Sequence, residues 1–101
     1  MKESQGDRMR KSTRIYRFPS NRRAEELSLT DQVCYIEGEL KEVKQAILLC
    51  ESKHRIIEEL WDTVHAAESA LRKFPLADVA RGFIFVLRKN AKRGDYRWLD
   101  A

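Results

Sequence analysis

Apolar residues recur at alternating steps of three and four along two stretches of this chain, and a helix gathers such a pattern onto one face. The first stretch predicts a helix from about Asp31 to Cys50, and the second predicts one from about Lys53 to Lys73. Because the link between them is short, we expect antiparallel neighbours with both apolar stripes in the core. The stripes are Val33, Ile36, Leu40, Val43, Ile47 and Cys50, then Ile56, Ile57, Leu60, Val64, Ala67, Leu71 and Phe74.

Polar residues and prolines mark where these helices begin and end. Ser28 or Thr30 is the expected N-cap of the first long helix, after a short helical turn at residues 24–29. Ser52 is the expected cap of the second, and Pro75 stops that helix. A third helix is predicted over residues 76–89, and its segment 83–87 is apolar on more than one face. A short helix of that kind is usually buried on both sides, so we expect the second side to meet another subunit.

The composition fits one helical domain. The chain has 101 residues, of which 43% are hydrophobic and 36% are charged, which favours a folded chain with a core of modest size. No apolar run approaches the ~18 residues of a membrane span, and the N-terminus lacks the apolar core of a signal peptide. We therefore expect a cytoplasmic protein of the all-α class: an antiparallel helical hairpin and a third helix, with a four-helix-bundle-like core completed by oligomerisation.

The charge is distributed unevenly. Residues 1–23 contain eight Lys or Arg and two acids, whereas residues 24–74 contain six Lys or Arg and eleven acids. We interpret residues 1–23 as a flexible basic arm and residues 24–101 as a single all-α domain. The arm either reaches phosphates through Arg14, Arg17, Arg22 and Arg23 or is a solvated basic tail.

Two pairs of acids stand on the predicted hairpin. Glu39 and Glu42 form one pair and Glu59 and Asp62 the other, each spaced i, i+3 on one helix face. If the helices bring all four carboxylates together, the cluster repels itself unless a cation is present. Such hard oxygen ligands suit Mg²⁺ or Mn²⁺, with a phosphate ester as the usual co-ligand.

Small residues accompany these acids. Thr63, Ala66 and Ala70 either leave room for a bound molecule or let another helix approach closely. Gly38 costs up to ~1 kcal/mol inside a helix relative to Ala, so we expect another backbone or a ligand to come close to it.

The segments GELKE at residues 38–42 and EELWD at residues 58–62 together resemble the ExxE…ExxD signature of the MazG-like nucleotide pyrophosphohydrolases, a branch of the all-α NTP pyrophosphatases. The resemblance covers residues 24–97 and implies hydrolysis of a nucleoside triphosphate to the monophosphate and pyrophosphate. It implies that Glu39, Glu42, Glu59 and Asp62 are the catalytic ligands of Mg²⁺, which activates a water. It also implies homodimers or homotetramers built around four-helix bundles. The expected phosphate-binding residues are Lys89, Asn90, Lys92 and Arg93.

Two other functions remain open. The chain is alternatively a non-catalytic helical oligomerisation or interaction protein with a degenerate MazG-like fold, whose acids are solvated surface. Nucleic-acid binding through the basic ends would need one basic face without acids, and the sequence does not show it. Trp61, Tyr96 and Trp98 either stack on a base or pack in a core or interface.

Overall fold

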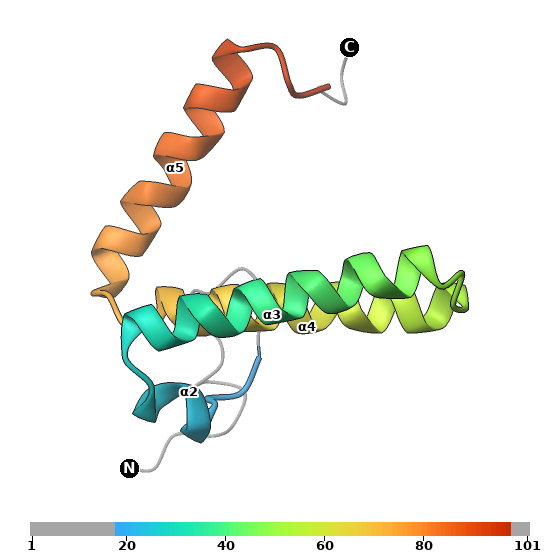
Figure 1. Cartoon of the computed structure of the whole chain (residues 1–101). Coiled ribbons are helices and arrows are strands. Elements are labelled where there is room, and N and C mark those ends of the chain that lie inside the picture. The colour runs from blue at the N-terminus through green and yellow to red at the C-terminus, as the bar shows by residue number, and fades with distance from the viewer. Residues whose placement is uncertain (1–17, 98–101) are drawn as a thin grey trace, which may run out of the picture.

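The computed structural model describes residues 18–97, and its four helices account for most of them (Figure 1). The helices are α2 (Arg22–Glu26), α3 (Leu29–Leu48), α4 (Lys53–Leu71) and α5 (Leu76–Lys92), and the described part of the chain contains no strand. The all-α fold and the three predicted long helices are therefore confirmed, with ends displaced by at most three residues. Residues 1–17, with most of the predicted arm, and 98–101, with Trp98, lie outside the described residues.

Side-chain caps start three of the helices, as the sequence indicated for two of them. The Ser28 hydroxyl accepts a hydrogen bond from the backbone N–H of Asp31 at 3.0 Å, and Ser52 accepts one from that of Arg55 at 3.2 Å. Asn21 caps α2 in the same way. These bonds satisfy N–H groups that have no partner within the first turn of a helix.

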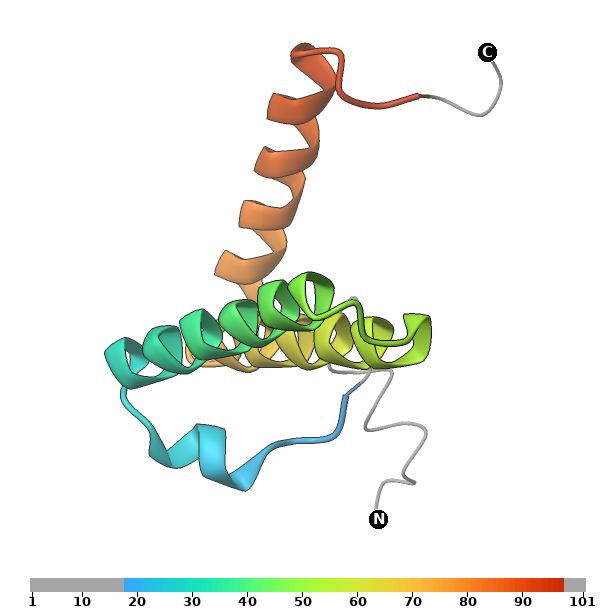
Figure 2. The same ribbon diagram turned by 45° about the vertical axis from the view of Figure 1, so that its right-hand side comes forward.

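The helices α3 and α4 form an antiparallel hairpin (Figures 1 and 2). The Gln32 amide, near the start of α3, donates to the Ala66 carbonyl in the second half of α4 at 2.9 Å. Of the predicted core stripe, Val43 is buried as expected, but Val33, Leu40 and Ile47 are 46%, 52% and 54% exposed. Cys50, also expected on the packed side, is exposed. The residues buried on the two helices are Gln32, Glu39, Val43 and Ala46 of α3 and Glu59, Ala66, Glu68 and Ser69 of α4.

The apolar residues instead form one exposed face of the hairpin. Leu40 follows the buried Glu39, and Leu60 follows the buried Glu59, so each leucine is turned by about 100° from the helix contact. Because the helices are antiparallel and have the same hand, equal turns point both leucines to the same side of the hairpin. We call this side the apolar face; it comprises Leu29, Val33, Leu40, Ile47, Ile57, Leu60 and Leu71, all about half exposed.

Residues 18–27 are bound to α4 by ring contacts and to the two residues that follow α4 by hydrogen bonds. The Phe18 ring stacks on His65 with centroids 4.2 Å apart and meets Trp61 edge-on at 6.1 Å. Arg72 donates to the Phe18 carbonyl, and Lys73 donates to the carbonyls of Ala24 and Leu27 at the end of α2. The helix α2 begins at Arg22, inside the arm predicted for residues 1–23.

The helix α5 rises from the end of the hairpin and packs on neither of its helices (Figures 1 and 2). None of its residues is buried, and Phe83, Phe85 and Val86 are exposed. Burial of this helix therefore does not occur within the single chain described by the structure. None of the helices in residues 18–97 is long and apolar enough to cross a membrane.

Gly38 lies inside α3, and the space around it shows whether another segment packs there. A methyl group built on Gly38 meets nothing within 4 Å among the described residues, so no other backbone of this part of the chain approaches the glycine, and the approach of a ligand stays a prediction. We predict that Gly38→Ala raises the free energy of unfolding by ~0.5–1 kcal/mol, because alanine loses less entropy in a helix. Thermal unfolding of variant and parent measures this, and a lower melting temperature for Gly38→Ala would contradict it.

Candidate metal centre

Three carboxylates meet in the middle of the hairpin. Glu39 and Glu42 come from α3 and Glu59 from α4, and one oxygen of each lies within 4.8 Å of the others. Glu39 is 7% exposed and Glu59 is 3% exposed, whereas Glu42 is at the surface. The cluster therefore has two carboxylates inside the helix contact and one at its rim.

The positions of these acids follow from a correspondence between α3 and α4 that we did not anticipate. Residues 20 apart match along the two helices: Ile36 with Ile56, Glu39 with Glu59, Leu40 with Leu60, Glu42 with Asp62, and Ala46 with Ala66. The same residue types therefore face the partner helix from both sides. Alignment of α3 with α4 at a shift of 20 residues therefore indicates, from the sequence alone, which face of each helix meets the other.

The antiparallel arrangement also explains why Asp62 stands apart from the three-carboxylate group. The bond from Gln32 to Ala66 sets the register in which Glu39 is level with Glu59. Glu42 is one turn from this level toward the link at residues 49–52, and Asp62 is one turn toward the other end. The two are thus separated by about 9 Å along the hairpin axis. Asp62 still acts on the site, because its charge contributes to the raised pKa of Glu59.

Two buried oxygens of the cluster have no hydrogen-bond partner among residues 18–97. They are Oε2 of Glu39 and Oε2 of Glu59. Burial raises the pKa of the Glu59 carboxyl above its ordinary value, the Arg55 guanidinium opposes this rise, and Glu42 and Asp62 add to it. An ionised carboxylate in such surroundings is costly unless a positive charge compensates it.

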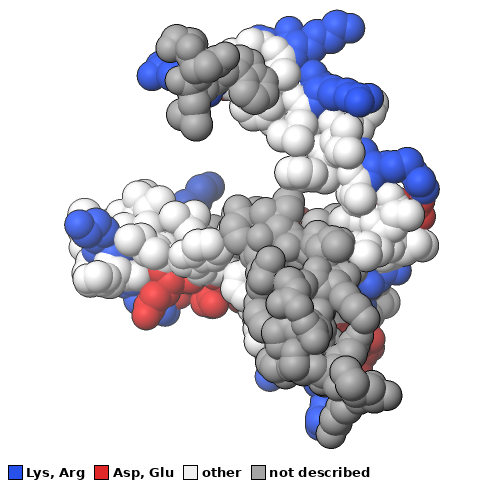
Figure 3. Space-filling view, turned by 180° about the vertical axis from the view of Figure 1, so that it is seen from behind, with Lys and Arg blue, Asp and Glu red and all other residues white. Residues whose placement is uncertain are grey.

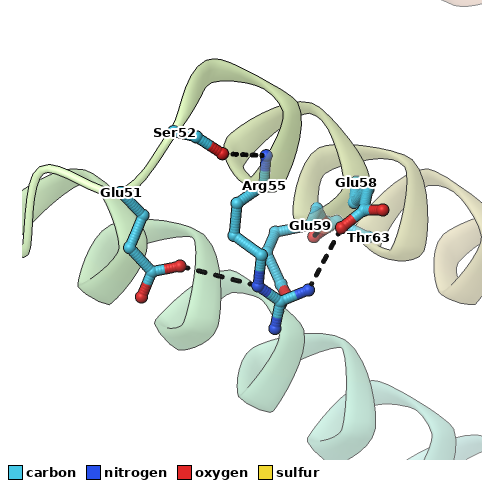
Figure 4. Close-up of polar contacts among 6 residues, drawn as sticks. All are labelled: Glu51, Ser52, Arg55, Glu58, Glu59 and Thr63. Carbon is cyan, nitrogen blue, oxygen red and sulfur yellow. Dashed lines mark hydrogen bonds and ion pairs between the residues drawn. The ribbon is translucent and has the colours of Figure 1, made fainter.

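Arg55 is the cation that pairs with Glu59. Its Nη2 lies 2.7 Å from Glu59 Oε1, and its other nitrogens lie 3.5 Å from Glu51 and 3.4 Å from Glu58 (Figure 4). Arg55 is therefore shared among three acids, two of which are at the surface. It compensates one oxygen of Glu59 and leaves the other oxygen unpaired.

The small residues beside the acids let the helices approach. Ala66 is buried, and its carbonyl accepts the bond from Gln32, so at this position the close-approach interpretation holds. The Thr63 hydroxyl donates to the carbonyl of Glu59, one turn earlier in the same helix. Tyr35 is a residue that sequence reasoning missed: burial and then the charge of Glu39 raise the pKa of its hydroxyl, which places it beside the cluster.

The predicted phosphate-binding residues lie elsewhere in the chain. Lys89, Asn90, Lys92 and Arg93 stand at the far end of α5, where Asn90 bonds to Tyr96 at 3.2 Å and Arg93 pairs with Asp95 at 2.5 Å. Acidic side chains gather on the hairpin edge that faces away from α5 (Figure 3). The structure thus brings Glu39, Glu42 and Glu59 together but not these four residues with them.

No protein-family model, curated protein or solved structure matches the chain. Three carboxylates within reach of one ion, two of them with an unpaired buried oxygen, fit a hard divalent cation such as Mg²⁺ or Mn²⁺.

Proposed function

We propose that the protein binds Mg²⁺ between α3 and α4 and hydrolyses a nucleoside triphosphate to the monophosphate and pyrophosphate. The observation that carries the proposal is the pair Glu39 and Glu59. These acids are buried on different helices, and each keeps one oxygen without a partner beside a third carboxylate. Arg55 compensates only one oxygen of Glu59, so the burial of these two carboxylates is costly without a further positive charge between them.

Each acid has a distinct part in the proposed reaction. Glu39 and Glu59 hold the cation from the two helices, Glu42 completes the group at the surface, and Asp62 lines the same side one turn along α4. Mg²⁺ supplies Lewis-acid polarisation of a phosphate and a more acidic water. In the reaction a water oxygen bonds to phosphorus, the phosphoanhydride bond between the α- and β-phosphates breaks, and pyrophosphate leaves. A carboxylate at the rim accepts the proton from the water.

We also propose that the protein is a homodimer or homotetramer. The support is the apolar face of the hairpin together with an α5 that buries none of its residues. Contiguous apolar patches of this kind mark interaction sites on proteins. The non-catalytic alternative retains this association and differs only in the acids, which would then have no effect on nucleotides or metal.

A pyrophosphate-release screen separates these two functions. Each ribonucleoside and deoxyribonucleoside triphosphate is incubated with the full chain in the presence and absence of Mg²⁺ or Mn²⁺. We expect release from at least one nucleotide, dependent on the cation. Absence of release from all of them, with a correctly folded protein, would favour the non-catalytic function.

A further inference from the structure

The two oxygens of the Glu59 carboxylate have different surroundings. Oε1 forms an ion pair with Nη2 of Arg55 at a distance of 2.7 Å. Oε2 is buried and has no hydrogen-bond partner in the described part of the chain. Because a carboxylate is planar, a contact that holds one oxygen also sets the direction of the other. The contact with Arg55 therefore determines where the unpaired oxygen of Glu59 lies.

The Arg55 guanidinium is itself held from two sides. Figure 4 shows it between Glu51 and Glu58, with its Nε 3.5 Å from Glu51 and its Nη1 3.4 Å from Glu58. A guanidinium is a planar fork with five N–H donors, so one group can serve several carboxylates. The charge of Glu59 is nevertheless the largest cause of the raised pKa of Arg55. The two surface acids thus restrict the guanidinium, and the buried acid is its main partner.

Tyr35 occupies the equivalent place on α3. In the 20-residue register of the two helices Tyr35 matches Arg55, and each precedes its buried acid by four residues. Side chains at this spacing are neighbours on a helix surface. Burial, the charge of Glu39 and a hydrogen bond to its carboxylate raise the pKa of Tyr35. Each buried acid of the cluster thus has a polar side chain of its own helix beside it, one turn earlier.

The ion pairs of Arg55 also show that the guanidinium does not fill the centre of the cluster. Within residues 18–97, these pairs are all with Glu59 and the two surface acids. None is with Glu39 or Glu42, although both have a carboxylate oxygen within 4.8 Å of one of Glu59. A side chain that took the place of a metal ion would pair with all three acids. Arg55 instead contacts the cluster at its edge.

We propose that Arg55 is a positioning residue of the metal centre. By holding Oε1 of Glu59, it keeps Oε2 available to a divalent cation that also binds Glu39 and Glu42. Side chains that orient the ligands of a metal in this way typically contribute about 10–100-fold to its affinity. This inference rests on the metal centre of the proposed function and adds the residue that orients one of its ligands.

Metal titrations of the full chain test this role. Arg55→Met removes the guanidinium and keeps an unbranched side chain, and binding of Mg²⁺ and Mn²⁺ is measured by calorimetry. We expect Arg55→Met to bind each ion about tenfold more weakly than the parent, or weaker still. Arg81→Met is the matched control, because Arg81 pairs with Asp78 on α5, away from the cluster. It should bind both ions as the parent does.

Two further measurements distinguish positioning from a general effect on folding. Arg55→Lys returns the charge without the planar fork, so its affinity should lie between those of Arg55→Met and the parent. The paramagnetic resonance spectrum of bound Mn²⁺ depends on the geometry of its ligands. At saturating Mn²⁺ and equal helix content, the spectrum of Arg55→Met should differ from that of the parent. Arg55→Gln is the second neutral variant if Arg55→Met does not fold.

The outcomes separate the inference from the function on which it rests. A parent that binds neither ion refutes the metal centre, and the role of Arg55 is lost with it. A parent that binds them, together with an Arg55→Met that binds them equally well, overturns only the positioning role. Tighter binding by Arg55→Met would also overturn it, because the guanidinium would then be a competitor of the ion.

Discussion

Glu59→Gln is expected to abolish Mg²⁺-dependent pyrophosphate release while leaving the metal-free protein at least as stable as the parent. The amide keeps the shape of the side chain and removes its charge. Because the pKa of Glu59 is raised in the folded chain, its contribution to stability is present at acidic pH and is lost as the pH rises through that pKa. The ionised carboxylate is therefore less favourable in the folded chain than in the unfolded one, and replacement by a neutral amide removes this cost.

Mg²⁺ should distinguish the two proteins in a thermal melt. A ligand that binds only the folded state at one hundred times its dissociation constant adds ~2.7 kcal/mol of stability. For a domain of this size, that corresponds to a rise of ~10–20 °C in the melting temperature. The parent should show such a rise in millimolar Mg²⁺, and Glu59→Gln should lose most of it. Glu39→Gln, Glu42→Gln and Asp62→Asn are expected to abolish hydrolysis in the same way.

Glu37→Gln is the matched control for these melts. Glu37 lies on the exposed surface of α3, so its replacement removes an equal charge without touching the cluster. It should keep both the activity and the response to Mg²⁺. If Mg²⁺ shifts neither the parent nor Glu59→Gln, or shifts both equally, the metal centre is disproved. A large loss of metal-free stability in Glu59→Gln would instead assign the acid a structural role.

Leu40→Glu combined with Leu60→Glu is expected to convert the oligomer to a monomer. Leu40 of α3 and Leu60 of α4 occupy matching positions of the two helices on the apolar face. Both are about half exposed in one chain. Full burial of a leucine is worth ~1.5–3 kcal/mol, so the double variant loses this term in each subunit and places charges in the interface. Light scattering at micromolar concentration should give at least twice the chain mass for the parent and the single-chain mass for the variant.

Leu48→Glu provides the comparison for this experiment. Leu48 is the most exposed of the large apolar residues described, and it lies outside the apolar face. Its replacement should leave the mass of the assembly unchanged. A parent that is monomeric at micromolar concentration and fully helical would contradict the oligomer.

The local features of the fold are those that the sequence determined by itself. Helix ends at Ser28 and Ser52 depend on bonds that span three residues, and the alternating three- and four-residue spacing requires no knowledge of distant contacts. The i, i+3 spacing of the acids similarly placed Glu39 with Glu42 and Glu59 with Asp62 on shared faces. These properties follow from the geometry of one helix, so they do not depend on which element packs against it.

Only the tertiary structure decided which side of each helix faces its partner. Both long helices have a broad apolar sector with the acids on its flank, and the periodicity alone favoured the leucines as the contact. The hairpin keeps Val43 buried but otherwise buries Gln32, Glu39 and Glu59, and the small side chains of Ala46 and Ala66 let the helices approach closely. The position of Asp62, one turn from the cluster, depends on the register between two antiparallel helices. A helix of given sequence has the same faces in any partnership, but the free energy of the whole assembly selects which face is covered.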